Sequence, residues 1–247
     1  MTNAVGPRAV FGVIVPSTNT VVEHDYWGAR IPGVAYRAGS MHIADPVMGS
    51  DGDFEALLGQ IRASIDVAVR DVLTAEPDRM VMGMSAETFW GGVAGNAAFE
   101  RRLRERTGLP VTTGASSCRA ALQALGCRRI AVFSPYQPVA DREVGRYFTE
   151  AGFDVAAISG LRCRTAMDIA RVGPARILEM VGALDDPSVE AIVQVGTNLS
   201  FVAQADALES ELGKPVVAIN AATLWHALRE HGLDDRVRGA GCLLRDH

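Results

Sequence analysis

Hydroxyl and amide side chains follow an apolar run near the start of the chain. The run VFGVIVPS at 10–17 ends in Ser17 and leads into Thr18, Asn19 and Thr20. Side chains of these types can donate hydrogen bonds to a carboxylate or cap the N-terminus of a helix. Capping accounts for one such residue, whereas four in succession indicate contact with a ligand, above all through Asn19.

The segment GMSAETFWGG at 83–92 places an acidic side chain directly after another apolar run. Glu87 stands close to Phe89 and Trp90, and a carboxyl group enclosed by apolar rings can act as a general acid or base. Ser85 of the same segment can donate a hydrogen bond to a substrate oxygen. The alternative for Glu87 is a solvated loop residue, or an acid in the first turn of a helix that the helix dipole stabilises.

Two comparable segments occur in the second half of the chain. Gly196, Thr197 and Asn198 follow the run AIVQV, and a glycine there lets a ligand approach the backbone while the next hydroxyl, amide and N–H groups bind an oxyanion. Tyr136 follows a further run and can present its phenol to a substrate carboxylate. The alternatives are a turn glycine with an asparagine cap, and a buried tyrosine bonded to backbone.

Metal and nucleotide motifs are absent from the sequence. Its five histidines show neither HExxH nor zinc-site spacing, and there is no GxxxxGK[ST] loop and no GxGxxG after the first apolar run. GxSxG with its Ser-His-Asp set is also missing. We therefore expect no metal, no nucleotide cofactor and no serine-hydrolase triad.

Composition limits the partners further. The formal charge of −5 and the lack of a long Lys/Arg run argue against nucleic acid and anionic membranes. No secretory signal is recognisable, and no apolar run approaches the roughly 18 residues of a spanning helix. The four cysteines show no CxxC pair, as expected for reduced thiols. We expect a cytoplasmic protein whose partner is a small carboxylate or carbonyl compound.

These residues must be positioned by an α/β fold, because short Val- and Ile-rich runs alternate with longer amphipathic segments. The runs predict a mostly parallel sheet covered by helices on both faces. Strands are expected at 10–17, 34–41, 79–85, 110–113, 128–135, 153–159, 191–197 and 215–220. Helices are expected at 53–75, 94–106, 115–125, 138–151, 168–183, 201–212 and 221–231.

The chain also carries an internal repeat. TGLPVTTGASSCRAALQALG at 107–126 shares a skeleton of Gly, Pro, Val, Ala and Leu with LGKPVVAINAATLWHALREHG at 212–232. We infer two pseudo-symmetric Rossmann-like halves, 8–112 and 113–220, with 221–247 packing back on the first. Ligands of open α/β sheets bind beyond the carboxyl ends of strands, so the cleft between the halves is the expected site.

The motifs VIVPSTNTVVE, MGMSAETFWGG, SPY, VQVGTNLS and GAGCLLR give the chain its family resemblance. It resembles the maleate cis–trans isomerase and arylmalonate decarboxylase branch of the aspartate/glutamate racemase superfamily. The resemblance implies duplicated halves, no metal or organic cofactor, and a homo-oligomer. It also implies a cysteine at the end of the middle strand of each half, and Met84 and Gly196 stand at those positions here. Asn19, Ser85, Tyr136, Thr197 and Asn198 match positions that resemble the family's carboxylate-binding groups.

The resemblance implies an isomerase or a lyase, decarboxylase-like, acting on a small carboxylic acid through an enolate-like intermediate. Without the two thiols another proton carrier is needed, and Glu87 is the ionisable residue beside a vacant cysteine position. We predict Glu87 and Tyr136 as catalytic residues, and Ser17, Thr18, Asn19, Ser85, Gly196, Thr197 and Asn198 as substrate-binding residues. The alternatives are a hydrolase or hydratase in which Glu87 activates water, and a binding protein without activity.

Overall fold

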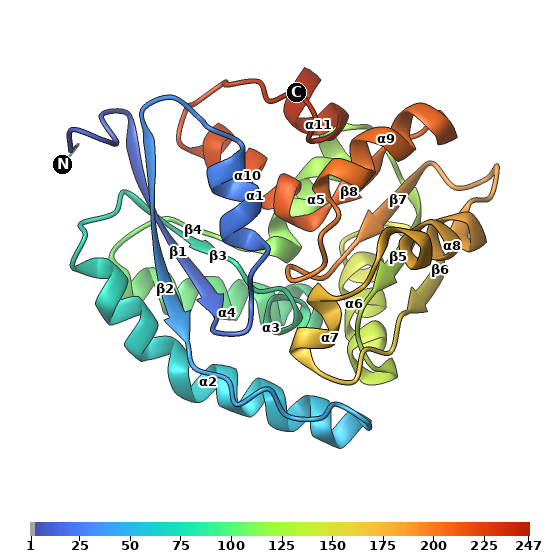
Figure 1. The fold of residues 1–247 in the computed structure, drawn as a ribbon, viewed down its shortest axis with the longest axis horizontal. Coiled ribbons are helices and arrows are strands. Elements are labelled where there is room, and N and C mark those ends of the chain that lie inside the picture. Colours follow the sequence, from blue (N-terminus) through green and yellow to red (C-terminus); the bar gives the residue numbers. More distant parts are fainter. Residues whose placement is uncertain (1–2) are drawn as a thin grey trace.

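The computed structural model describes residues 3–247 and contains two four-stranded parallel sheets (Figure 1). The first sheet has the order β2-β1-β3-β4 and the second β6-β5-β7-β8. Its strands are β1 (Ala9–Pro16), β2 (Val34–Met41), β3 (Arg79–Met82) and β4 (Val111–Thr112), then β5 (Arg129–Ser134), β6 (Asp154–Gly160), β7 (Ala191–Gln194) and β8 (Val216–Ala218).

Each sheet uses the same strand order relative to its first strand, which confirms the two pseudo-symmetric α/β halves. The strands β3 and β7 are buried along their whole length, as expected for parallel strands covered on both faces. Ile14 of β1 lies beside Met82 of β3, and Phe133 of β5 lies beside Gln194 of β7. The polar segments that follow these four strands therefore leave the two sheets at equivalent edges.

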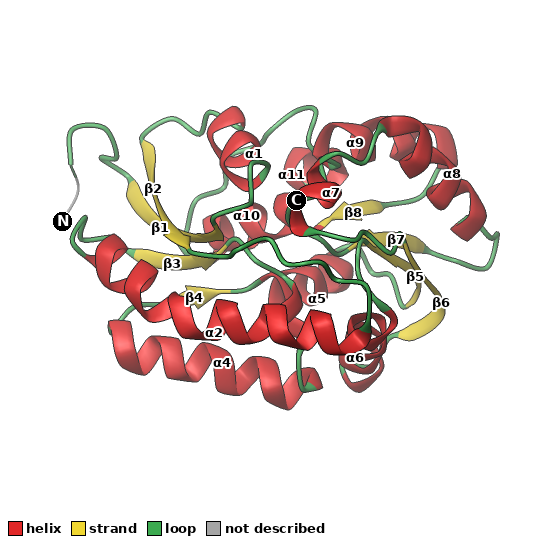
Figure 2. Ribbon diagram, turned by 60° about the horizontal axis from the view of Figure 1, so that its bottom comes forward, coloured by secondary structure: helices red, strands yellow, loops and turns green. Residues whose placement is uncertain are grey.

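Helices cover both faces of the sheets (Figure 2). α2 packs on β1 and β2, α10 on β3 and β4, α6 on β6, and α8 on β5 and β6. The helices are α1 (Val22–Gly28), α2 (Asp51–Leu73), α3 (Ala86–Phe89), α4 (Gly92–Thr107), α5 (Gly114–Ala124), α6 (Pro138–Glu150), α7 (Ala166–Ala170), α8 (Pro174–Leu184), α9 (Val202–Leu212), α10 (Ile219–Glu230) and α11 (Gly241–Asp246).

The equivalent helices of the sequence repeat, α5 and α10, pack against each other and join the halves. A Cβ atom on Gly114 would lie 2.7 Å from Cδ1 of Ile219, so glycine permits this close approach. The C-terminal segment contacts both halves. α10 reaches β3 and β4, whereas α11 packs on α9 and β8.

The eight expected strands are all present, but one expected helix is wrong. The segment 168–183 forms two helices, α7 and α8, which are separated by 171–173. Pro174 is the first residue of α8, where its missing N–H costs nothing, and it disfavours helical backbone at Gly173. The short helices α1, α3 and α11 were not expected, because four to seven residues carry little periodicity.

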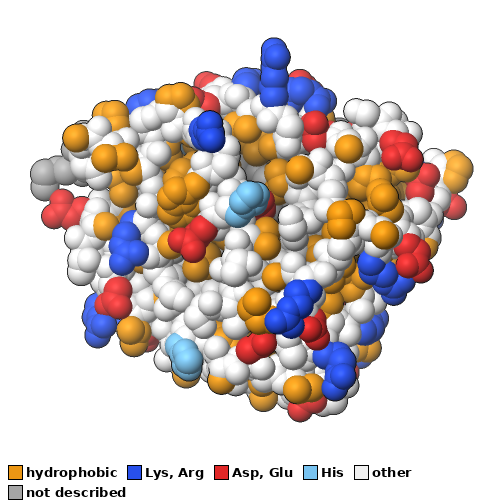
Figure 3. Space-filling model, in the orientation of Figure 1, with side chains coloured by type: hydrophobic (Ala, Val, Ile, Leu, Met, Phe, Trp, Pro, Cys, Tyr) orange, Lys and Arg blue, Asp and Glu red, His pale blue; other side chains and the backbone are white. Residues whose placement is uncertain are grey.

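The surface shown in Figure 3 carries basic and acidic side chains interspersed rather than gathered by sign. Within residues 3–247, no helix combines the length and the apolar character needed to cross a bilayer. The longest, α2, buries one face through residues such as Phe54, Leu58 and Ile65 and leaves the opposite face to solvent.

Candidate active site

A small cavity of about 60 Å³ lies at the carboxyl ends of β1, β3, β5 and β7, between the two halves. Of the predicted site residues, six contribute to its lining. These are Thr18, Asn19, Ser85, Tyr136, Thr197 and Asn198.

Asn19 is fixed by bonds to both halves. Its Oδ1 accepts the backbone N–H groups of Val21 and Val22 at 3.0 Å each, at the start of α1. Its Nδ2 donates to Oγ1 of Thr197 at 3.3 Å. The side chain thus acts as a cap and as a contact between the halves, and the hydroxyl hydrogen of Thr197 is left to be donated elsewhere.

Asn198 makes the reciprocal contact from the second half. Its Oδ1 accepts the N–H of Thr20 at 3.1 Å, and its Nδ2 donates to the carbonyls of Thr18 and Ala166 at 3.2 and 2.9 Å. Because every amide hydrogen and the carbonyl oxygen is used, this side chain positions the loop after β1. It lines the cavity without a polar group to spare for a ligand.

Ser85 and Tyr136 face each other across the cleft and their hydroxyl groups share a short hydrogen bond. Ser85 Oγ also accepts the backbone N–H of Thr197 at 3.4 Å. The two hydroxyl groups have two hydrogens between them. One lies between the two oxygens, so the other hydrogen can be donated into the cavity. Burial raises the pKa of the Tyr136 phenol far above its ordinary value, and the bond to Ser85 offsets this only in part.

Tyr136 is held by a polar network behind it. Its N–H donates to Ser134 Oγ at 3.1 Å, and its carbonyl accepts Nη1 of Arg162 at 2.6 Å. Asp141 accepts bonds from both Ser134 and Arg162. The phenol ring packs against Phe54, with 5.3 Å between the ring centroids. The orientation of the hydroxyl group is therefore set by α2, α6 and the loop after β6.

The structure places Glu87 differently from the sequence-based expectation. It is buried, as expected, but it lies outside the residues that line the cavity. Nε of Arg62 donates to both of its carboxylate oxygens, at 2.8 and 3.0 Å. Arg62 comes from α2 and stacks toward the ring of Trp90. Glu87 thus joins α3 to α2 through an ion pair.

Two other predicted residues also lie outside the lining. Ser17 Oγ accepts the N–H of Ile43 at 2.9 Å, so it fixes the segment after β2 rather than facing the cavity. Gly196 is packed against the ring of Pro135, where a Cβ would lie 2.5 Å from Cδ. Gly196 is thus needed for close packing of the loop. Met84, the other position implied for a cysteine, does line the cavity.

The remaining wall of the cavity is apolar and was missed by sequence reasoning. The apolar side chains come from the segment after β2, from α2 and from α7: Ile43, Met48, Phe54, Leu57, Ile61 and Ile169. The spacing of Phe54, Leu57 and Ile61 marks a buried helix face, but nothing local distinguishes a core face from a cavity wall. Tyr136 is the one ionisable side chain in the lining, all of which the structure describes.

The cysteines lie elsewhere. Cys118 and Cys163 are buried, and Cys127 and Cys242 are half-buried. Burial raises the pKa of Cys163 to about 11 and that of Cys242 to about 12, which leaves both as weakly nucleophilic thiols at neutral pH. In the part of the chain that is described, no group of three His, Cys, Asp or Glu side chains is placed to hold a metal ion.

Two parallel sheets with a cavity between their carboxyl ends define an α/β protein of two similar lobes. Residues 11–244 match the model of the arylmalonate decarboxylase family, and the chain belongs to that family. The resemblance to the maleate isomerase and arylmalonate decarboxylase branch is thereby confirmed, and the chain is an enzyme of the isomerase or lyase type.

Individual relatives agree over nearly the whole length. The chain is 28% identical to arylmalonate decarboxylase of Bordetella bronchiseptica over 90% of each chain. It is 26% identical to maleate isomerase of Pseudomonas putida over 94% of this chain and 96% of that one. In fold it is similar to a cysteine-to-serine mutant of Nocardia farcinica maleate cis-trans isomerase that holds a covalently bound succinylcysteine intermediate. That comparison has a TM-score of 0.86 at 24% identity, over 97% of this chain and 99% of the other.

Proposed function

We propose that this enzyme is a cofactor-independent decarboxylase of a small malonate-type acid, working through an enolate-like intermediate. The observation that carries the proposal is the make-up of the cavity. Hydroxyl side chains from the strand ends and apolar side chains from the segment after β2, from α2 and from α7 line it together, and the lining contains no Lys, Arg, Asp or Glu. The names of the relatives, arylmalonate decarboxylase and maleate isomerase, support a substrate with two carboxyl groups.

One substrate carboxylate would bind to the neutral hydroxyl groups. Thr18, Ser85, Tyr136 and Thr197 carry hydroxyl groups at the ends of different strands, and three of their four hydrogens can be donated to a ligand, because Ser85 and Tyr136 share one between them. Hydroxyl donors held rigidly by the protein stabilise negative charge without having to reorganise. Their number suits a carboxylate, which accepts up to about four hydrogen bonds.

The second carboxylate would then face the apolar wall formed by residues such as Phe54, Leu57 and Ile61. Removing water from a carboxylate raises its free energy, whereas the CO₂ that replaces it is neutral and tolerates apolar surroundings. The bond between the α-carbon and this carboxylate breaks and CO₂ leaves. The electron pair remains as an enolate on the first carboxyl group, whose oxygens are held by the hydroxyl donors.

The enolate carbon must next receive a proton, and we assign this step to Tyr136. Its raised pKa keeps the phenol protonated at neutral pH, so it serves as a donor and not as a base. After transfer, the tyrosinate would be stabilised by Ser85 until it takes a proton from water. Asn19 and Asn198 have a positioning role in this scheme, since their side chains hold the loops together.

Isomerisation of a small unsaturated acid is the second candidate, because most of the relatives found are maleate isomerases. A succinylcysteine intermediate in one of them indicates addition of a cysteine to the substrate there. No cysteine of this chain lines the cavity, whose lining residues are all described. Isomerisation by this chain would need a nucleophile other than cysteine. We therefore rank decarboxylation above isomerisation as the candidate function.

Product analysis tests the proposal. The enzyme is incubated in D₂O with phenylmalonate, methylmalonate or maleate, and products are identified by NMR. We expect a monoacid from a malonate, with one deuterium at the α-carbon for each CO₂ released. Fumarate formed from maleate would favour the isomerase. Oxygen taken up from ¹⁸O-labelled water would favour the hydratase or hydrolase alternative, and binding of these acids without turnover would favour a non-catalytic protein.

A further inference from the structure

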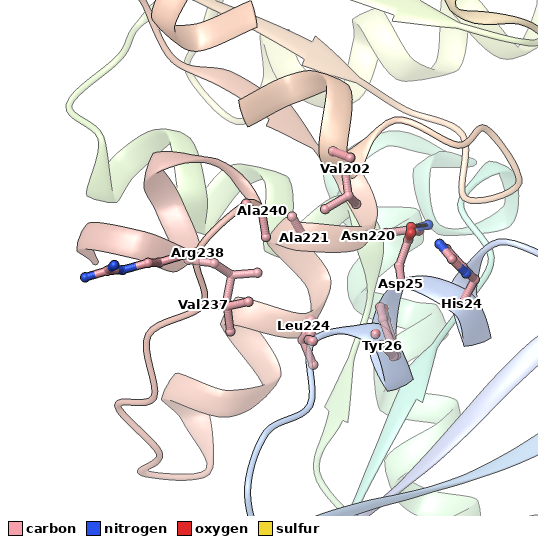
Figure 4. Close-up of a pocket in the computed structure, with 15 residues that line it drawn as sticks. His24, Asp25, Tyr26, Val202, Asn220, Ala221, Leu224, Val237, Arg238 and Ala240 are labelled. Atoms are coloured by element: carbon pink, nitrogen blue, oxygen red, sulfur yellow. Dashed lines mark hydrogen bonds between the residues drawn. The ribbon is translucent and has the colours of Figure 1, made fainter. Parts of the chain in front are cut away.

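A second cavity, of about 190 Å³, lies between α1, α9, α10 and the segment before α11 (Figure 4). It is larger than the cavity at the strand ends and shares no lining residue with it. None of the predicted site residues belongs to it, and the proposed reaction does not use it.

The polar side chains that line this cavity include His24, Asp25 and Asn220, and the last two point toward each other in Figure 4. Nδ2 of Asn220 donates to Oδ2 of Asp25 at 2.8 Å and to the carbonyl of Thr197 at 3.0 Å. If the side-chain amide of Asn220 were flipped, its Oδ1 would face the Asp25 carboxylate and the Thr197 carbonyl, which are both acceptors. The hydrogen bonds therefore determine the orientation of this amide. Asn220 is only 2% exposed, and its Oδ1 has no hydrogen-bond donor among residues 3–247.

An unpaired buried acceptor is costly in a native protein and calls for an explanation. Here it belongs to Asn220, which lines a cavity together with the carboxylate of Asp25, and an amide oxygen and a carboxylate only accept hydrogen bonds. The remaining wall is mostly apolar, with Tyr26, Leu224 and Val237 among its members. Arg238 also borders the cavity, but Figure 4 shows its side chain extending away from Asp25.

We propose that this cavity is a second binding site, for a small ligand that carries a primary ammonium group on a short apolar chain. The ammonium group would donate to Asp25 and approach Asn220, and the chain would lie against Tyr26, Leu224 and Val237. This site is independent of the decarboxylase proposal, because its test measures binding and not turnover.

The carboxyl group of Asp25 gives the site a pH dependence. Burial raises the pKa of Asp25 to about 6, although the bond from Asn220 and the charge of His24 act in the opposite direction. The titratable groups around it are His24 and Tyr26 on α1 and Arg238 on the segment before α11. With a pKa of about 6, roughly a tenth of the carboxyl groups are ionised at pH 5 and nearly all at pH 8. Binding should therefore be about tenfold weaker at pH 5.

Titration calorimetry of the full chain with n-butylammonium chloride tests the site, with 1-butanol as the uncharged probe. We expect saturable one-to-one binding of the amine at pH 8, at least tenfold tighter than that of the alcohol. Asp25→Asn should weaken amine binding at least tenfold and remove its pH dependence. Glu23→Gln removes an exposed charge from the same helix outside the cavity and should change neither.

Equal affinity for the amine and the alcohol in the wild-type chain would overturn the proposal without any variant. So would a pH dependence that persists in Asp25→Asn, because it would not come from the Asp25 carboxyl group. Circular dichroism melting of each variant checks that it is folded. Should Asp25→Asn fail to fold, the wild-type comparison of n-butylammonium with tetramethylammonium decides the matter, since the latter has no N–H to donate and should bind at least tenfold more weakly.

Discussion

Replacing Tyr136 by Phe removes one oxygen atom from the centre of the candidate active site and leaves the ring against Phe54. The hydroxyl group is the sole ionisable group in the cavity lining, and it shares a hydrogen bond with Ser85. If Tyr136 delivers the proton to the enolate, Tyr136→Phe should lower kcat by about 10²–10⁴-fold. At about 1.4 kcal/mol for each factor of ten, this corresponds to roughly 3–6 kcal/mol of transition-state stabilisation.

The expected effect of Tyr136→Phe on folding is much smaller. Losing one buried hydrogen bond costs about 0.5–1.5 kcal/mol net. For a chain of this size, that lowers the melting temperature by about 1–6 °C. Tyr147→Phe is a matched control, because Tyr147 is a buried tyrosine outside the cavity whose hydroxyl has no partner among the described residues. It should keep kcat within about twofold of the wild type.

Steady-state kinetics of CO₂ release, measured with whichever malonate is turned over, separates these effects. The pH profile adds an independent check. An ordinary tyrosine loses its proton near pH 10. Because burial raises the pKa of Tyr136, it stays protonated at that pH, and ionisation of Tyr136 should not lower kcat between pH 7 and 10. Wild-type kcat in Tyr136→Phe would falsify the assignment of the proton donor.

Three further predictions follow from the packing. Glu87→Gln and Arg62→Gln break the same half-exposed ion pair. Each should lower the free energy of unfolding in urea by about 1–2 kcal/mol and change kcat less than tenfold. A 10²–10⁴-fold loss of kcat confined to Glu87→Gln would instead restore the acid/base role of Glu87. Gly196→Ala places a methyl group against Pro135 and should lower the free energy of unfolding in urea by about 1–3 kcal/mol. A decrease below about 0.5 kcal/mol would contradict this, because it would mean that the loop shifts to make room for the methyl group. The raised pKa of Asp25 means that its contribution to stability is greatest near pH 4 and is lost as pH rises through about 6. Asp25→Asn should therefore exceed the wild type by about 1–3 kcal/mol at pH 7 and match it at pH 4 in urea unfolding, and an equal difference at both pH values would contradict the assignment.

The sequence by itself determined the eight strands and the equivalence of the two halves. Buried parallel strands must be continuous apolar runs, and such runs are visible without any knowledge of their neighbours. The carboxyl ends of parallel strands meet at one edge of each sheet, and the internal repeat predicts that the two edges face a common cleft, so the polar residues that follow β1, β3, β5 and β7 could also be placed together in advance. Asn19, Ser85, Tyr136 and Thr197 come together for this reason.

Only the tertiary structure decided which partner each polar group has. Glu87 was expected to be enclosed, and it is, but its partner Arg62 lies 25 residues away on a different helix. Asp25 and Asn220 meet across 195 residues, and nothing near either of them predicts that contact. The physical reason is the range of the interactions. The apolar patterns that predict strands and helices extend over only a few neighbouring residues, whereas an ion pair or a cavity wall depends on how distant elements pack.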